Sequence, residues 1–211
     1  MPNQRLVLLG DSILDNAPYT NPEPDTAAHL QRLLPSWYVQ RLAQDGAVMS
    51  SVRLQLAELK SRPAIVVLSI GGNDAVQHIG LLEQRQASST DVLDQLVAIG
   101  DDFARRYESV VRSVAAESDR LVLCTIYEVQ LEPSRHARLA RVPLAVLNDR
   151  IVRTASRLGL DVLDLRTVCA EPSDFVLQIE PSAQGAAKIA RAIAGLVNLG
   201  DGLTSGAVFS A

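Results

Sequence analysis

The feature that most constrains the fold is an alternation of short apolar runs with longer segments of helical periodicity. Five runs are predicted to be buried parallel strands: Arg5–Leu9, Trp37–Leu42, Ala64–Ser69, Leu121–Ile126 and Asp161–Leu165. Between them, apolar residues recur every three or four positions over Ser50–Leu59, Val92–Ala116, Leu144–Leu158 and Gly185–Val197. Such alternation favours right-handed crossovers and helices on both faces of the sheet. The sequence therefore predicts an α/β protein, a three-layer α/β/α sandwich with a flavodoxin-like, five-stranded parallel sheet.

The length and composition indicate one globular domain. A chain of 211 residues is long enough for a single substantial core, and we place the domain at residues 1–200 with a loose tail at 201–211. Cys124 and Cys169 are too few for a disulfide framework, and Cys124 falls inside a predicted strand as a buried thiol. The sequence leaves the oligomeric state open.

Charge and hydropathy exclude several classes of partner. The formal net charge is −4, and the basic residues form no stripe that would follow a phosphate backbone, so nucleic acid is not an expected partner. No apolar stretch reaches the length of a membrane span. The first apolar run is too short for a secretory signal, so a cytoplasmic location is expected.

Small and polar residues follow three of the predicted strands at the point where each strand ends. Gly10-Asp11-Ser12 follows the first strand, Asp45-Gly46-Ala47 the second and Gly71-Gly72-Asn73-Asp74 the third. Ligands of doubly wound sheets bind beyond the carboxyl ends of the strands, and glycine lets backbone amides approach a ligand closely. The pattern predicts a catalytic cleft at this edge of the sheet.

These blocks resemble those of the SGNH (GDSL-type) serine hydrolase family. Gly10-Asp11-Ser12 looks like its nucleophile block, Gly46 stands where the family carries an oxyanion glycine, and Gly71–Asp74 is similar to its GxND block. The segment 179–190 resembles the block that closes such domains. The resemblance covers roughly residues 5–197 with the blocks in the family's order, and it implies the SGNH hydrolase fold.

The chemistry that the resemblance implies is acyl transfer to serine. Ser12 is the expected nucleophile, and the N–H groups of Ser12 and Gly46 with the Asn73 side-chain amide are the expected oxyanion donors. One such donor typically contributes about 3 kcal/mol to the transition state. Turn formation by Gly46 and Asn73 and capping by Ser12 are simpler interpretations, but they leave the joint occurrence of the blocks unexplained. The expected substrate is a small acyl ester, with no metal and no organic cofactor.

The closing block departs from the family pattern at two positions, those of the histidine base and of the aspartate that orients it (the family's relay). The family's Asp-x-x-His-Pro reads Leu177-Gln178-Ile179-Glu180-Pro181 here, so Glu180 stands at the histidine position and Leu177 at the aspartate position. A glutamate has an ordinary pKa of about 4.3, which makes it a weak base unless burial or a nearby acid such as Asp174 raises that pKa.

Three interpretations of this departure stay open at the level of sequence. In the first, Glu180 is the base. In the second, one of the three histidines replaces it, and His78, four residues beyond Asp74, is better placed than His29 or His136. In the third, the protein has lost hydrolase chemistry and uses the pocket to bind a small ligand or a partner.

Overall fold

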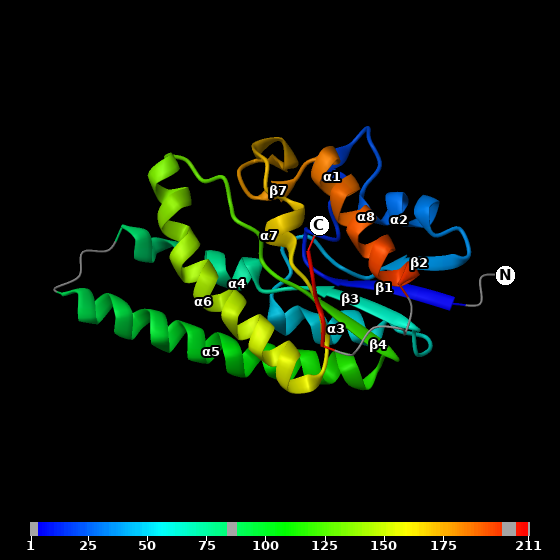
Figure 1. Ribbon diagram of the computed structural model, residues 1–211, viewed down its shortest axis with the longest axis horizontal. Helices are drawn as coiled ribbons and strands as arrows, with labels where there is room; N and C mark the ends of the chain where they lie inside the picture. Colours follow the sequence, from blue (N-terminus) through cyan, green and yellow to red (C-terminus); the bar gives the residue numbers. More distant parts are fainter. Residues whose placement is uncertain (1–3, 84–87, 200–205, 211) are drawn as a thin grey trace.

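The computed structural model describes residues 4–83, 88–199 and 206–210, and it confirms the α/β class. Six parallel strands form the central sheet in the order β2-β1-β3-β4-β5-β8 (Figure 1). The strands are β1 (Gln4–Gly10), β2 (Trp37–Arg41), β3 (Ile65–Ser69), β4 (Arg120–Cys124), β5 (Asp161–Leu163) and β8 (Val208–Phe209).

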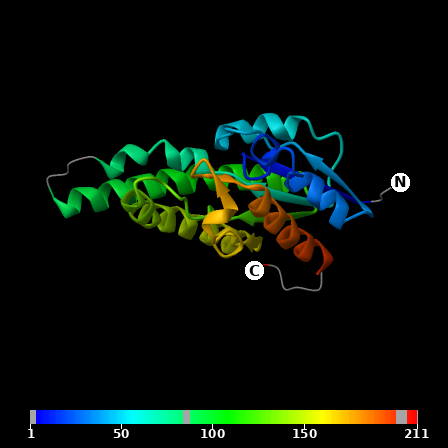
Figure 2. The ribbon, with the colours of Figure 1, turned by 90° about the horizontal axis from the view of Figure 1, so that it is seen from above.

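Helices cover both faces of this sheet, as the continuous burial of Leu6–Gly10 in β1 requires. Leu6 and Leu8 pack in one core cluster with residues of α2 (Thr26–Leu33) and α8 (Ala183–Asn198). Val7 and Leu9 pack in a second cluster with α5 (Ser89–Ala116) and α6 (Ser134–Leu158). The view from above shows α5 and α6 running side by side beyond the sheet (Figure 2). The three-layer sandwich is thus formed by side chains that alternate along each strand.

Shorter elements complete the chain. The remaining helices are α1 (Ala17–Thr20), α3 (Val52–Ala57), α4 (Gly72–Val76) and α7 (Leu165–Val168). Three single 3-10 turns are η1 (Met49–Ser51), η2 (Ile79–Leu82) and η3 (Pro172–Asp174), and a small hairpin pairs β6 (Phe175–Val176) with β7 (Glu180–Pro181). No helix in the described ranges is both long and apolar enough to cross a membrane.

The direction of strand addition reverses at β1, and this reversal positions the site. β1 pairs with β2 on one side and with β3 on the other, and Gly10 lies opposite Ser69 where β1 and β3 end. The crevice beyond such a switch point is where open α/β sheets bind their ligands. The three predicted blocks therefore leave the sheet around one crevice.

Three details of the sequence prediction need correction. The sheet has six strands, because β8, within the predicted tail, pairs with β5; a two-residue strand is too short to show periodicity. Residues 201–205 and 211 of that tail lie outside the described residues. Trp37–Arg41 is partly exposed because β2 is an edge strand. Helix α6 begins at Ser134, ten residues before the predicted start, because its first turns are mostly polar and Pro143 interrupts the pattern.

Candidate active site

The turn that carries Ser12 requires glycine before it. Gly10 has a φ of +123°, and a Cβ at this position would lie 1.7 Å from the Ser69 carbonyl oxygen. The buried Gln55 side chain accepts from the Gly10 N–H and donates to the Gly10 carbonyl, both at 2.8 Å. The Asp11 carbonyl then accepts from the N–H groups of residues 14 and 15, which forms a helical turn around Ser12. Ser12 is thereby fixed at the carboxyl end of β1.

The predicted oxyanion donors lie on loops that one hydrogen bond joins. Asn73, in the first turn of α4, donates from Nδ2 to the Ala47 carbonyl at 2.9 Å, directly after Gly46. This bond uses one of the two amide hydrogens and leaves the other available. Within the described part of the chain, the N–H groups of Ser12 and Gly46 have no hydrogen-bond acceptor. Their joint role as an oxyanion hole remains a prediction.

Asp74 has a structural task that the motif did not reveal. Its buried carboxylate accepts from the Met49 N–H at 3.0 Å and from Arg106 Nη1 at 2.9 Å. These bonds fasten the segment after Gly46 to α4 and α5. Asp74 therefore helps to set the position of the loop that carries Gly46.

Glu180 lies in β7 and lines the same cavity as Ser12. Its Oε2 atom is buried, and among the described residues no hydrogen-bond partner reaches it. Burial is the largest cause that raises the pKa of Glu180, and repulsion by Asp45 raises it further, whereas the Ser12 hydroxyl stabilises the ionised form and lowers it. Glu180 and Ser12 thus line one cavity and interact electrostatically, while the role of Glu180 as a base stays a prediction.

The family's relay aspartate has no counterpart in the structure. Leu177, at its position, is 75% exposed at the tip of the hairpin with a φ of +48°. Asp174, which we expected to raise the pKa of Glu180, is fully buried and paired with Lys188 Nζ at 2.8 Å. An acid does raise the pKa of Glu180 as expected, but that acid is Asp45 and not Asp174.

Asp11 is a second buried carboxyl at the site, although its place in the nucleophile block suggested only that it could orient loop amides. Its side chain lines the cavity and is 2% exposed. Burial is the main cause that raises the pKa of Asp11 to about 7, and the charge of Glu180 also raises it. The cavity that Ser12 lines therefore also holds two carboxyl groups, and the charge of Glu180 opposes ionisation of Asp11.

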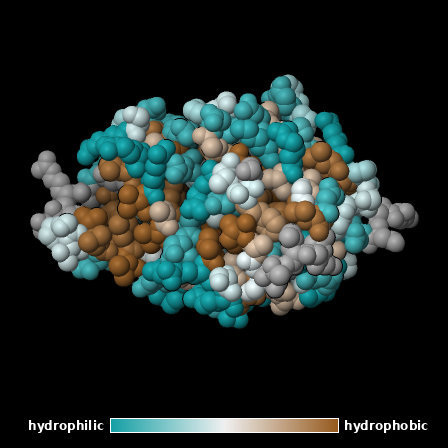
Figure 3. All heavy atoms as spheres, viewed as in Figure 1, coloured by the Kyte–Doolittle hydropathy of each residue, from teal (hydrophilic) through white to brown (hydrophobic). Residues whose placement is uncertain are grey.

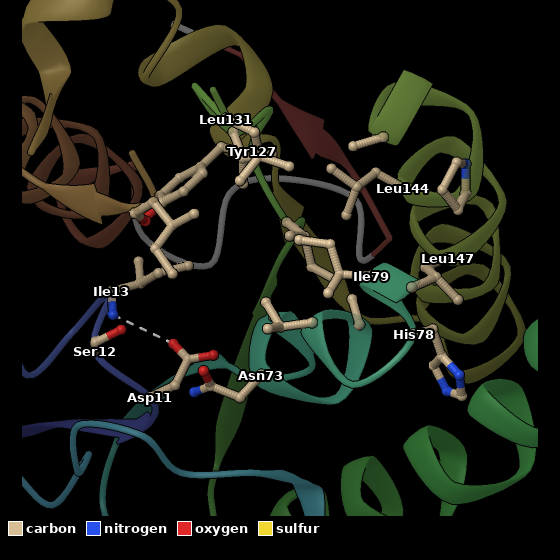
Figure 4. Close-up of a pocket in the computed structure, with 18 of the residues that line it drawn as sticks. Asp11, Ser12, Ile13, Asn73, His78, Ile79, Tyr127, Leu131, Leu144 and Leu147 are labelled. Carbon is tan, nitrogen blue, oxygen red and sulfur yellow. Dashed lines mark hydrogen bonds between the residues drawn. The ribbon is translucent and has the colours of Figure 1, made fainter. Parts of the chain in front are cut away.

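The cavity next to Ser12 is mostly apolar, with its carboxyl, hydroxyl and amide groups at one end and His78 on the opposite side. It has a volume of about 160 Å³. In Figure 4, Asp11, Ser12 and Asn73 lie together at one side, while Tyr127, Leu131, Ile79, Leu144 and Leu147 enclose the rest. Apolar side chains also gather on the outer surface around α6 (Figure 3), where Ile79 and Val142 are exposed. A substrate with a reactive polar group and an apolar chain fits this division.

Hydrogen bonds fasten one wall of the cavity to the hairpin that carries Glu180. Tyr127 Oη donates to the Ile179 carbonyl at 2.7 Å. Gln178 accepts from the Gln130 N–H through its carbonyl at 2.8 Å and from the Glu132 N–H through Oε1 at 2.7 Å. The connection between β4 and α6 therefore forms one unit with the hairpin.

The structure places none of the three histidines beside Ser12. His78 lines the cavity but is exposed, and Figure 4 shows its ring on the side opposite Ser12. His29, in α2, and His136, in α6, are not among the residues that line the cavity. His136 instead lies 3.9 Å from Glu83.

Comparison with known proteins decides the family. The model of the GDSL-like lipase/acylhydrolase family matches residues 8–188. The chain belongs to this family. None of the curated proteins compared with the chain matches it.

Solved structures of other hydrolases share the fold of this family member. A phospholipase A1 from Streptomyces albidoflavus has a TM-score of 0.69 at 17% identity, covering 93% of this chain and 98% of that one. An extracellular lipase from Streptomyces rimosus has a TM-score of 0.67 at 15% identity, with 93% and 99% covered. An acetylxylan esterase from Geobacillus stearothermophilus has a TM-score of 0.62 at 18% identity, with 94% of each covered. At these identities the likeness shows the SGNH hydrolase fold.

Proposed function

We propose that this protein hydrolyses carboxylic esters of small acyl groups through an acyl-enzyme on Ser12. The family and its structural neighbours support an ester hydrolase. The observation that carries the proposal for Ser12 is its position between the free backbone donors, the Glu180 carboxylate and an apolar cavity. The groups proposed for proton transfer, oxyanion stabilisation and acyl binding then all surround Ser12 Oγ.

Glu180 is the proposed base. Ser12 Oγ attacks the ester carbonyl carbon while its proton passes to Glu180, and the alkoxide leaving group takes that proton when the tetrahedral intermediate collapses. Water then attacks the acyl-enzyme, again with Glu180 as proton acceptor, and the carboxylic acid leaves as Ser12 Oγ regains its proton. The raised pKa of Glu180 makes it a better base than an ordinary glutamate.

The developing oxyanion meets three proposed donors, the N–H groups of Ser12 and Gly46 and the second amide hydrogen of Asn73. Donors that are already fixed need no reorganisation as the charge forms. The hydrogen bond from Asn73 to Ala47 keeps the amide fixed against the Gly46 loop. Loss of the Asn73 amide should therefore lower the rate by a factor of about a hundred or more.

The apolar cavity is the proposed acyl site. Apart from His78, the described residues that line it beyond the polar end are apolar, which suits an acyl chain better than a sugar or a charged group. The polar side chains outside it, Tyr19 and Asp45, are joined by a hydrogen bond of 2.7 Å and are placed to meet the alcohol part of the ester. The cytoplasmic location stays a prediction of the sequence.

The test is hydrolysis of p-nitrophenyl esters from acetate to decanoate by the wild type and Ser12→Ala. We expect Ser12→Ala to lose nearly all activity at unchanged stability. Ser113→Ala is the matched control, because that exposed hydroxyl only donates to the Ser109 carbonyl on α5. Equal rates for the wild type and Ser12→Ala would overturn the proposal. No hydrolysis by the wild type, together with tight binding of the acids, would favour a binding protein.

A further inference from the structure

The buried aspartates of this protein divide into two kinds. Four of them are each paired with a cation at 2.6 to 2.9 Å: Asp74 with Arg106, Asp161 with Arg120, Asp164 with Arg166 and Asp174 with Lys188. Asp11 is the exception, since no lysine or arginine of the described residues pairs with it. A buried carboxylate without a cation is costly, and protonation removes that cost.

The hydrogen bonds of Asp11 do not compensate for the missing cation. Its Oδ1 atom accepts from the Ile13 N–H and from the Ser69 hydroxyl, both at 3.3 Å, which is long for either kind of bond (Figure 4 shows the former). Within the ranges that the structure describes, no donor reaches Oδ2, which faces Gly72 at the cavity. The surroundings thus stabilise a carboxylate poorly.

The groups that face Asp11 add no positive charge. Glu180 from β7 repels an ionised Asp11. Tyr107 from α5, Cys124 from β4 and Tyr127 beyond it also interact with Asp11, and burial raises the pKa of each, so all three remain neutral at physiological pH. Glu180 is therefore the group whose charge competes with that of Asp11.

The two carboxyls are not equivalent toward Ser12. Glu180 is only about half-buried, and the Ser12 hydroxyl stabilises its ionised form, which marks it as the better place for a negative charge. Asp11 is more deeply buried than Glu180, and its two hydrogen bonds are both long.

We propose that Asp11 works as a neutral carboxylic acid, so that Glu180 holds the only negative charge beside Ser12. Asp11 is then a positioning residue. Its proton keeps a second negative charge away from the point where the oxyanion forms. A neutral Asp11 also leaves the pKa of Glu180 free from repulsion by a fully charged neighbour. This inference rests on the proposed function and adds a second titrating group to it.

As a consequence, the rate of ester hydrolysis should pass through a maximum as the pH rises and should fall on both sides of it. Below the maximum, protonation of Glu180 removes the base. Above it, ionisation of Asp11 adds a charge that opposes the transition state. With the pKa of Asp11 at about 7, the neutral fraction falls about 30-fold between pH 6 and pH 8.5.

The kinetic test compares rates at pH 8.5 and pH 6 in the wild type and Asp11→Asn, which keeps the shape and cannot ionise. We expect the ratio of the two rates to rise at least about tenfold in Asp11→Asn. Asp161→Asn, which removes a buried but ion-paired carboxylate at the other end of the sheet, should show the wild-type ratio. An unchanged ratio in Asp11→Asn would overturn the proposal.

A second measurement needs no catalysis and separates this inference from the proposed function. In wild-type protein with carbon-13 carboxyl labels on aspartate and glutamate, the Asp11 and Glu180 signals are identified by their absence in Asp11→Asn and Glu180→Gln. We expect Asp11 to titrate at a higher pH than Glu180. The reverse order would overturn the inference even if the esterase is active, and the expected order would sustain it even if no ester is hydrolysed.

Discussion

The side-chain amide of Gln55 holds both backbone groups of Gly10, with N–H to Oε1 and Nε2 to carbonyl distances of 2.8 Å. Gln55 is fully buried and comes from α3, 45 residues further along the chain. The turn that directs Ser12 into the cavity therefore depends on the Gln55 side-chain amide as well as on the Gly10-Asp11-Ser12 block.

Replacement of Gln55 by alanine should destabilise the protein by roughly 1–3 kcal/mol, because the buried Gly10 N–H loses its acceptor, whereas the Gly10 carbonyl still accepts from the Gln44 N–H at 3.0 Å. Urea unfolding measures this change. Gln31→Ala is the matched control, since exposed Gln31 makes the same pair of bonds to the Trp37 carbonyl and the Val39 N–H. That control should cost less than about 1 kcal/mol because water replaces the lost bonds. Equal losses in both variants would contradict the role of Gln55.

Much of the fold was predictable because its signals are local. Apolar runs mark the strands, and helical spacing marks α5 and α8 within a few residues. The first turns of α6 were missed because they are polar, and β8 because only pairing with β5 defines it.

For the site, the order of the motifs along the chain predicted which blocks come together, but not the contacts of the individual side chains. The blocks around Ser12 and Asn73 indicated one crevice, which the strand order confirms. Gln55 had no sequence signal, because its role depends on burial and on its two hydrogen bonds to Gly10. Asp11 was recognised only as the residue before the nucleophile, because its lack of a cation partner is visible in the structure alone. Asp174 was wrongly expected to raise the pKa of Glu180, because its ion pair with Lys188 is formed only in the tertiary structure.

Restoring the family's relay should move the pH dependence toward neutral and alkaline values. In Leu177→Asp/Glu180→His, the new imidazole has an ordinary pKa of about 6.5, and aspartate tolerates the positive φ of residue 177 better than leucine does. We expect faster ester hydrolysis than wild type at about pH 8, and Glu180→His alone should gain less. A double variant slower than Glu180→Gln at that pH would argue that position 180 does not act as the base.

Filling the cavity should shorten the preferred acyl chain. Ala140, in α6, is buried and lines the cavity, so Ala140→Trp should reduce kcat/KM for decanoate esters at least about tenfold more than for acetate esters. Ala145→Trp places the same side chain on the exposed face of α6 and should keep the wild-type preference. Parallel losses for both chain lengths in Ala140→Trp would place the acyl chain elsewhere.

The pKa of Asp11 also makes a prediction for stability. That pKa is raised from 3.8 to about 7 in the folded protein, so its proton stabilises the fold fully below about pH 4, and this stabilisation is lost as the pH rises to 7. Asp11→Asn keeps a neutral side chain throughout. Relative to the wild type, its free energy of unfolding should therefore increase between about pH 4 and about pH 8, by up to roughly 4 kcal/mol. A difference that stays constant over this range would show that Asp11 titrates alike in both states.

The most direct test of the central claim is labelling of the purified protein with a fluorophosphonate, which reacts with an activated serine, from about pH 4 to about pH 9. Wild type, Ser12→Ala, Glu180→Gln and His78→Ala are compared side by side. The account predicts labelling of the wild type and of His78→Ala, and its loss in Ser12→Ala and Glu180→Gln. Loss of labelling in His78→Ala, or no labelling of the wild type at any pH, would contradict a Ser12 nucleophile activated by Glu180.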